Sequence, residues 1–321
     1  MFSLILQIQA FLEKLKKRKA LWFTTITTLA LLGVVGTMSY LNTMTQRATK
    51  NLYETTNASY FKDLDVKIGD SLANLEIVGS LLLANPDFIA AVSVQDNAAA
   101  LTEKLNTLGA NLKEIVKNGI EVELYNQNFI KVASSSSSVT LTQEVEESDA
   151  LRRTWNDKKA YKLMEYEDGK VYLKALFPTE KGVLEVKRSV DFLFDIYDGN
   201  GKIFNVLLDR DFLDMKRLQA YKFQRIGKDE VSVQAKVDTV FLQKINDVDF
   251  DKVIESKYII QDGYFVLAKP LLNLDGKKVG VLVLGENLEK EASLPRMVKK
   301  ISTGLTTAAI GLVVALLVLM I

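Results

Sequence analysis

Hydrophobic residues fill one uncharged stretch near the start of the chain, residues 21–41. About twenty apolar residues match the roughly 30 Å hydrocarbon core of a bilayer. A basic cluster precedes the stretch, and such clusters stay on the cytoplasmic side of a membrane; it consists of Lys14, Lys16, Lys17, Arg18 and Lys19. We therefore predict a transmembrane helix over 21–41 and a cytoplasmic N-terminus over 1–20. A cleaved signal peptide is the alternative, but a polar, helix-compatible segment follows residue 41 in place of a cleavage site.

A second uncharged apolar stretch covers residues 301–321 and again has spanning length. Two spans place the intervening residues, about 42–300, outside the cytoplasm, in a two-pass protein of the inner membrane. Arg296, Lys299 and Lys300 precede the second span on the predicted outer side, which runs against the positive-inside tendency. The first helix usually dominates orientation, and its basic cluster is the larger one.

A helical period continues beyond the first span. Apolar residues recur three or four positions apart, at Tyr53, Phe61, Leu64, Ile68, Leu72, Leu75, Val78 and Leu82. The first proline of the chain is Pro86. We therefore predict a stalk helix over 42–84 that continues the transmembrane helix. Its apolar stripe has two possible partners, the sheets that follow or the same helix of a second chain.

The pattern then changes to that of an α+β module over 85–197. A helix is expected over 97–117, a strand hairpin over 120–133, a serine-rich loop from Ser134, a short helix over 149–158 and two strands over 170–177 and 182–190. The Asp-Gly-Asn-Gly sequence at 198–201 marks the start of a second module, 198–295. Its expected strands cover 203–208, 230–236, 258–262, 264–270 and 278–284, with helical segments at 211–218 and 240–245.

The two modules end alike. DGKVYLKALFPTEKGVLEV at 168–186 and DGYFVLAKPLLNLDGKKVGVLVLG at 262–285 both give Asp-Gly, strand, proline, turn, glycine and strand. This internal repeat predicts two tandem copies of one antiparallel-sheet fold.

The amino-acid composition excludes several classes of catalytic and metal-binding site. The chain has no cysteine and no histidine, which excludes thiolate catalysis, histidine triads and histidine-ligated metal sites. We expect no cofactor, no metal and no enzymatic activity. The 41 basic and 40 acidic residues nearly balance, so there is no basic footprint for nucleic acid.

This organisation resembles the double Cache sensory domains of bacterial chemoreceptors and sensor kinases. NPDFIAAVSVQDNAAALTEKLNTL at 85–108 is similar to the opening of one double Cache subfamily, and KPLLNLDGKKVGVLVLGENLE at 269–289 is similar to its close. The resemblance covers about 42–295 and implies PAS-like modules, of which the one far from the membrane binds the ligand. The amino-acid-binding motif of some members is absent, so the resemblance does not name the ligand.

Candidate ligand-binding residues lie around the strand at 170–177. If Val171, Leu173, Ala175 and Phe177 face the stalk helix, Tyr172 and Lys174 face the other way. Cations and aromatics nearby complete a set suited to a small organic anion: Arg152, Arg153, Trp155, Tyr161, Tyr172 and Lys174. The alternative is an ordinary solvated surface.

Two further groups of residues are weaker candidates for a functional site, and a structural role is the stronger expectation for both. Glu121 and Glu123 share a strand face and are able in principle to act as acid and base, but we expect them to be solvent-exposed charges. Tyr258, Tyr264 and Lys269 are expected to serve packing in the second module.

The sequence therefore predicts the sensing region of a transmembrane receptor: a chemoreceptor, a sensor kinase or a cyclic-di-nucleotide signalling protein. It would act as a homodimer and transmit ligand binding through the second span. The alternatives are a membrane-anchored extracytoplasmic hydrolase and a structural envelope protein.

Overall fold

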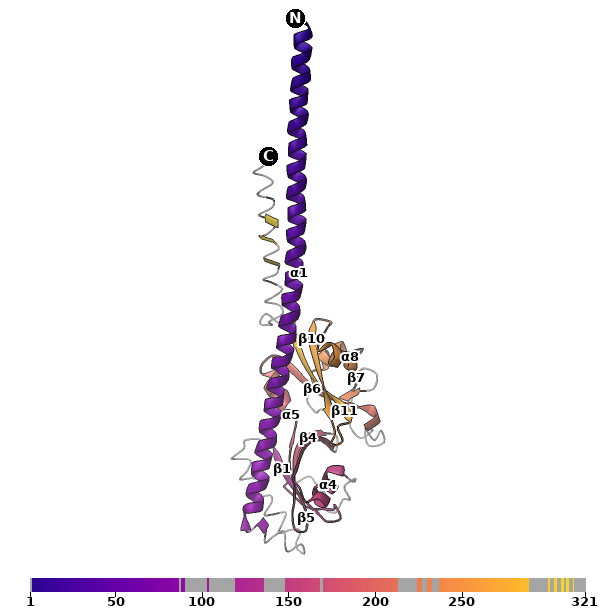
Figure 1. Ribbon diagram of the computed structural model, residues 1–321. Helices are drawn as coiled ribbons and strands as arrows, with labels where there is room; N and C mark the ends of the chain where they lie inside the picture. The colour runs from indigo at the N-terminus through magenta and orange to yellow at the C-terminus, as the bar shows by residue number, and fades with distance from the viewer. Residues whose placement is uncertain are drawn as a thin grey trace. The chain divides into compact units, whose positions relative to one another are not determined.

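The computed structural model describes residues 2–86, 88–89, 103, 119–135, 148–167, 170–212, 224–226, 230–232 and 237–288, with 300, 303–304, 307–308, 310–311 and 314. The chain divides into two compact units, Thr56–Glu289 and the remainder, Met1–Thr55 with Lys290–Ile321. Among the described residues, every strand lies in the first of these units (Figure 1).

A single helix, α1, covers Phe2–Ala84, 83 residues without a break. The predicted continuity of the segment 21–41 with the stalk is thus confirmed. The helix ends before Pro86, where the Asn85 side chain accepts a hydrogen bond from the backbone N–H of Phe88 at 3.2 Å. Among the described residues, the structure contains no helix with the length and apolar character needed to cross a membrane. Most of the predicted second span, 301–321, lies outside the described residues.

The first sheet has five antiparallel strands in the order β2-β1-β5-β4-β3. Their bounds are β1 Ile120–Asn126, β2 Lys131–Ser134, β3 Tyr161–Glu167, β4 Lys170–Pro178 and β5 Gly182–Ser189. The helix α4, Asp149–Asp157, precedes β3. The hairpin, the short helix and the closing strand pair predicted from the sequence are confirmed, whereas β3 was not predicted.

The second sheet has six strands in the order β7-β8-β6-β11-β10-β9. These are β6 Lys202–Asp209, β7 Gln224–Ile226, β8 Glu230–Ser232, β9 Ile259–Gln261, β10 Tyr264–Leu272 and β11 Lys278–Asn287. The 3-10 turn η1 covers Arg210–Phe212, and the helices are α5 Asp191–Asp198, α7 Thr239–Lys244 and α8 Phe250–Ser256. Apart from residue 103, the predicted helix 97–117 lies outside the described residues, as does most of the predicted helical segment 211–218.

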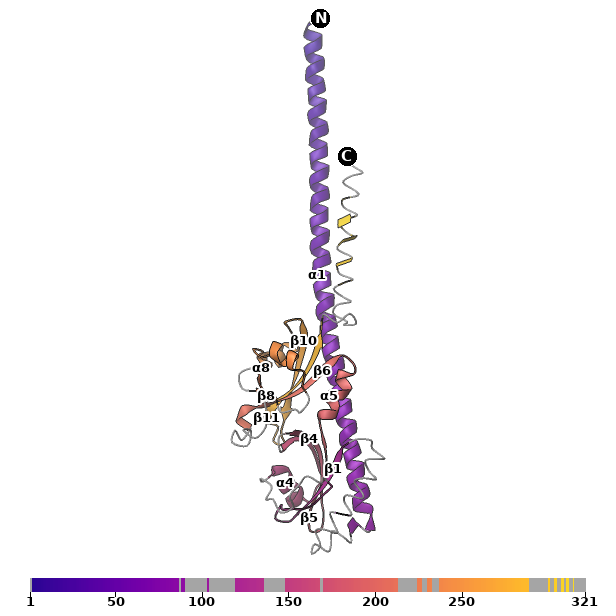
Figure 2. The same ribbon diagram turned by 180° about the vertical axis from the view of Figure 1, so that it is seen from behind.

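The last third of α1 packs along one face of both sheets (Figures 1 and 2). Leu64, Leu75, Val78 and Leu82 of its apolar stripe are at most 3% exposed. Gly79 allows the closest approach, because a Cβ there would lie 2.1 Å from the Phe177 ring of β4. The stripe predicted from the sequence is therefore covered by the sheets of its own chain along this part of the helix.

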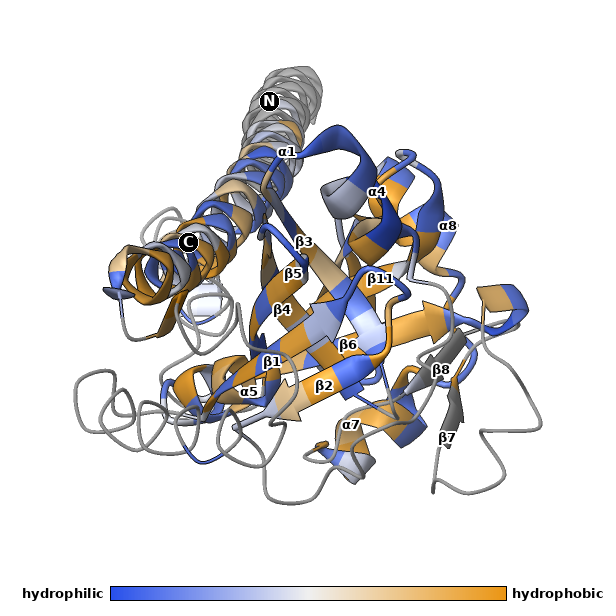
Figure 3. Cartoon of the chain, turned by 90° about the horizontal axis from the view of Figure 1, so that it is seen from below, coloured by the Kyte–Doolittle hydropathy of each residue, from blue (hydrophilic) through white to orange (hydrophobic). Residues whose placement is uncertain are grey.

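The opposite face of the first sheet carries α4 (Figure 1). Tyr125, Ala150, Leu151, Leu176 and Val183 form a buried apolar cluster there. The corresponding face of the second sheet packs against α7 and α8, with Phe241, Leu242, Phe250 and Val253 in its core. Hydrophilic positions interrupt the hydrophobic strands of the sheets (Figure 3).

Candidate functional site

Seven charged side chains gather on the face of the first sheet that also carries α4. We call them the ion network: Lys131, Lys174, Lys187, Glu123, Glu165, Glu167 and Glu185. Alternation along the strands places them together, because residues two apart share a face. Glu123 shares a face with Tyr125, and Lys174 shares a face with Leu176. Tyr125 and Leu176 both belong to the cluster under α4.

The strand register places like charges of the network directly opposite one another. Glu123 of β1 lies directly opposite Glu185 of β5, and Lys174 of β4 lies directly opposite Lys187 of β5. Like charges directly opposite one another destabilise a sheet. Here each lysine also reaches glutamates on neighbouring strands, so the repulsion within each pair is offset by attraction to the other.

The lysine ammonium groups lie between carboxylates. Lys187 Nζ is 2.9 Å from Glu123 Oε2, 2.9 Å from Glu167 and 3.3 Å from Glu185 Oε1. Lys174 Nζ is 2.7 Å from Glu167 Oε2, 2.9 Å from Glu165 Oε2 and 3.4 Å from Glu185 Oε2. Lys131 Nζ is 2.8 Å from Glu123 Oε2. Glu185 thus joins Lys174 and Lys187, and Glu167 joins the same two lysines and also lies 3.9 Å from Lys131 Nζ.

Burial makes these interactions strong. Glu123, Glu185, Lys174 and Lys187 are between 0 and 3% exposed, and charges taken out of water require close partners. Burial lowers the pKa of Lys174, but Glu185, Glu165 and Glu167 outweigh it and hold that pKa well above its usual value. Both lysines of the central pair are therefore charged at neutral pH.

The glutamates differ from one another. Burial raises the pKa of Glu167, but Lys174 and Lys187 more than compensate and bring it to about 2. For Glu185 burial dominates over the same two lysines, and its pKa lies above the ordinary value. Neither carboxylate oxygen of Glu185 receives a hydrogen bond. Glu185 is therefore the least well compensated charge of the network.

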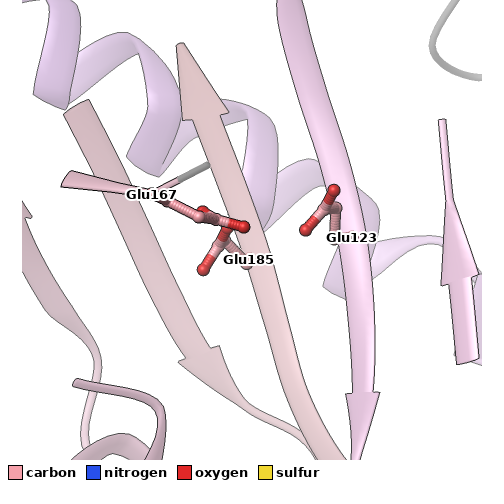
Figure 4. Close-up of side chains that lie close together, drawn as sticks. All are labelled: Glu123, Glu167 and Glu185. Atoms are coloured by element: carbon pink, nitrogen blue, oxygen red, sulfur yellow. The ribbon is translucent and has the colours of Figure 1, made fainter. Parts of the chain in front are cut away.

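Carboxylate oxygens of Glu123, Glu167 and Glu185 lie within 4.8 Å of one another (Figure 4). This geometry alone would suit a divalent cation. However, Lys187 Nζ lies within 3.3 Å of all three carboxylates. The residues present thus supply their own cation, and the donor set does not fit a metal ion.

Two aromatic side chains border the network. The Tyr125 hydroxyl donates a hydrogen bond to Glu123 Oε2 at 2.6 Å. The Tyr172 ring lies 4.9 Å from Lys187 Nζ, in cation–π geometry. Together they give the site both a charged and an aromatic character.

The predicted site residues fall into two groups. Tyr172 and Lys174 do face away from α1; Lys174 belongs to the network, and Tyr172 borders it. The other four lie on α4 and at the start of β3: Arg152, Arg153, Trp155 and Tyr161. Arg153 pairs with Asp275, Trp155 packs at the edge of the apolar cluster, and the Tyr161 hydroxyl donates to Asp157. The organic-anion site expected from their cations would have to compete with these carboxylates.

Five of the seven network residues were missed from the sequence as candidates, and a sixth was wrongly placed. We expected Glu123 to be a solvent-exposed strand charge, but it is 1% exposed. The available signal was charge at alternate positions of otherwise apolar strands, as in Glu185 and Lys187 of β5. In the second module, the expected packing roles are confirmed: Tyr258 packs on Phe265, Tyr264 packs on Phe241, and Lys269 pairs with Asp65.

No model of a protein family matches the chain, and no curated protein matches it. Solved structures do. An extracellular ligand-binding receptor from Desulfohalobium retbaense has a TM-score of 0.37 and 11% identity, with 74% of this chain and 40% of that chain covered. The periplasmic domain of Vibrio cholerae LuxQ has a TM-score of 0.36 and 13% identity over 74% of this chain and 97% of that one.

A third match is the ligand-binding domain of the Pseudomonas aeruginosa amino acid chemoreceptor PctC in complex with GABA. Its TM-score is 0.23 at 13% identity, with 67% of this chain and 99% of that chain covered. The descriptions of these three proteins name an extracellular ligand-binding receptor, a periplasmic domain and a chemoreceptor ligand-binding domain.

Proposed function

We propose that the chain is the sensing region of a two-pass inner-membrane receptor, with 21–41 and 301–321 as spans and about 42–300 outside the cytoplasm. One observation carries this proposal. The helix that packs against both sheets is continuous with the uncharged segment 21–41. A transmembrane helix that continues into the core of a folded domain would carry conformational changes of that domain to the membrane.

We further propose that a small molecule binds at the ion network. Tyr172 and Lys174 contribute from β4, and Arg152, Arg153, Trp155 and Tyr161 stay predicted contributors from α4 and β3. The side chains of Glu165 and Glu167 are 26% and 13% exposed, which makes them the most accessible charges of the network. A ligand would therefore meet carboxylates first.

The charge balance favours a ligand with a positively charged group over the organic anion expected from the sequence. Four carboxylates face three ammonium groups in the network, and Glu185 has no hydrogen bond. An anion would have to displace a glutamate from Lys174 or Lys187. An amine adds the missing positive charge without breaking an existing pair.

A thermal-shift screen of the full chain tests both proposals. Matched pairs of linear amines and carboxylic acids of equal length are added, since a ligand that binds only the folded state raises the melting temperature. We expect amines to raise it and Glu165→Gln to abolish the shift, while Glu76→Gln, which breaks the exposed pair with Lys162, preserves it. A shift with acids alone would overturn the ligand class. No shift with any small metabolite, or saturable hydrolysis of ester, peptide or glycoside substrates, would overturn the sensor.

The α1 face opposite the sheets supports the proposed parallel homodimer. Val66, Ile77 and Leu81 are 51 to 61% exposed there. Gly69 lies on the same exposed side, with nothing within 4 Å of its Cβ position. A second copy of α1 packed along this face would cover these residues.

A further inference from the structure

The turn between β10 and β11 reaches from the second sheet to the first. Leu274, at this turn, packs against the apolar cluster formed by Tyr125, Ala150, Leu151, Leu176 and Val183. This cluster lies beneath α4, on the sheet face that carries the ion network. The second module thus places one side chain in the core of the first.

An ion pair fixes the same turn to α4. The Arg153 guanidinium of α4 pairs with Asp275, the neighbour of Leu274. The turn itself has a defined shape. Asn273 Oδ1 accepts hydrogen bonds from the backbone N–H groups of Asp275 at 3.0 Å and Lys277 at 2.9 Å, and Gly276 adopts a φ of 75°. A turn held this way moves as one piece with the strands it joins.

The other end of α4 is bonded to the ion network. Ser148 Oγ accepts from the backbone N–H of Leu151 at 3.4 Å and so caps the helix. The same hydroxyl donates to Glu165 at 3.2 Å. Glu165 in turn accepts from Lys174 Nζ at 2.9 Å. A change in the partners of Lys174 therefore reaches the first turn of α4 through a single side chain.

We propose that α4 is a latch between the two modules, held by Glu165 and Ser148 at its N-terminus and by Leu274 and Asp275 of the β10–β11 turn along its length. Rearrangement of the ion network shifts α4 and releases or tightens the turn, and β11 carries the change to the end of the second module. The Arg153–Asp275 pair is exposed and contributes little, so Leu274 provides the main attachment. This proposal rests on the proposed function only in one respect: the ligand that would rearrange the ion network.

Hydrogen–deuterium exchange of the full chain tests the latch without a ligand. Leu274→Ala should accelerate amide exchange in α4 severalfold, although the substitution lies in the other module. Reciprocally, Glu165→Gln should accelerate exchange in the turn 273–277. Leu272→Ala is the matched control, because Leu272 belongs to the same hairpin but is 49% exposed; it should change exchange in α4 by less than its effect on the hairpin itself.

Two results would overturn the proposal. Exchange that changes only around each substituted residue would show that the modules are not coupled through α4. If Leu274→Ala unfolds the protein, the smaller truncation Leu274→Val replaces it, and unchanged exchange in α4 would have the same meaning. Reciprocal changes in exchange combined with a failed thermal-shift screen would leave the latch in place and overturn only the ligand-sensing function.

Discussion

Glu167 and Glu185 share Lys174 and Lys187, yet the network treats the two carboxylates differently. Glu167 lies 2.7 and 2.9 Å from the lysines and keeps its charge down to low pH, whereas Glu185 lies 3.3 and 3.4 Å away with no hydrogen bond. The difference of about half an ångström decides whether attraction exceeds the cost of burial.

We predict opposite responses to removal of the two charges. Glu167→Gln should lower the free energy of unfolding at pH 7 by about 3 kcal/mol, because two buried lysines lose their best partner. Glu185→Gln should change it by less than about 1 kcal/mol, because an amide avoids the burial cost of a charge that is poorly compensated. Urea denaturation of both variants measures this. Equal losses would show that the two carboxylates are equivalent.

Acidification should reveal the same difference. The pKa of Glu167 is depressed from 4.5 to about 2, so its stabilising contribution is complete above about pH 5 and is lost as the pH falls towards 2. The raised pKa of Glu185 acts in the opposite sense: its contribution is present below the ordinary value and is lost as the pH rises.

The free energy of unfolding should therefore decline between pH 5 and pH 2, less steeply in Glu167→Gln and more steeply in Glu185→Gln. Denaturation curves across this range test the order of the three slopes. Identical slopes would mean that neither carboxylate has a shifted pKa in the folded protein.

Alternation along β4 predicted the sheet face of Tyr172 and Lys174 but not the residues beside them, for a physical reason. The side of a strand that a charge faces follows from alternation, as it did for Lys174. Which charges lie next to it depends on strand order, and β1, β5, β4 and β3 are adjacent in an order that periodicity does not reveal. Glu123 and Lys187, 64 residues apart in the chain, meet only in the folded sheet.

At the scale of elements, the long helix followed from its periodicity, whereas several of the short elements were not predicted. The continuity of α1 followed from an unbroken period and the absence of proline before Pro86. β3 was missed because Glu165 and Glu167, which belong to the ion network, make its sequence look solvent-exposed. α8 was missed because seven residues give barely two helical turns, although Asp249 caps it by accepting from the backbone N–H of Lys252.

The contact between α1 and the first sheet should depend on Gly79. Gly79→Ala places a methyl group against the Phe177 ring, so we expect a loss of about 1 to 3 kcal/mol in the free energy of unfolding. Gly69→Ala is the matched control in the same helix. Its Cβ meets nothing within 4 Å, so the better helix propensity of alanine should stabilise the protein by up to about 1 kcal/mol. Destabilisation by both variants would contradict a close approach specific to Gly79.

The proposed dimer makes a prediction for the same helix. Single cysteines at Val66, Ala73 and Ile77 should form disulfide cross-links in membranes under oxidising conditions, because these residues are exposed on one side of α1. Cysteines at Leu64 and Leu75, which are buried against the sheets, are the controls and should not cross-link. Cross-linking at none of the exposed positions would indicate a monomer, and gel mobility distinguishes the outcomes.

At the scale of the whole molecule, the proposed signal leaves the second module through the end of β11. The backbone N–H of Leu288 donates to the carbonyl of Gly263 at 2.8 Å and holds this end to the start of β10. Two glycines inserted after Leu288 preserve that hydrogen bond and make the segment that follows it longer and more flexible. We expect unchanged thermal shifts by the most effective amine but loss of output from a cytoplasmic transducer fused after residue 321. Unchanged output would place the transmitting route elsewhere.

Pro270 lies within β10, opposite Val281 of β11. On its other side β10 is paired with β9 only at Tyr264, Phe265 and Val266, so among the described residues the rest of β10 is a sheet edge. Proline is tolerated in a sheet where its missing N–H faces an unpaired side. Such an edge is a poor template for a strand from another molecule, and the charge of Lys269 beside it adds to the effect. Pro270 therefore disfavours the pairing of this edge with a strand of a neighbouring copy and the joining of two sheets into a continuous β-structure.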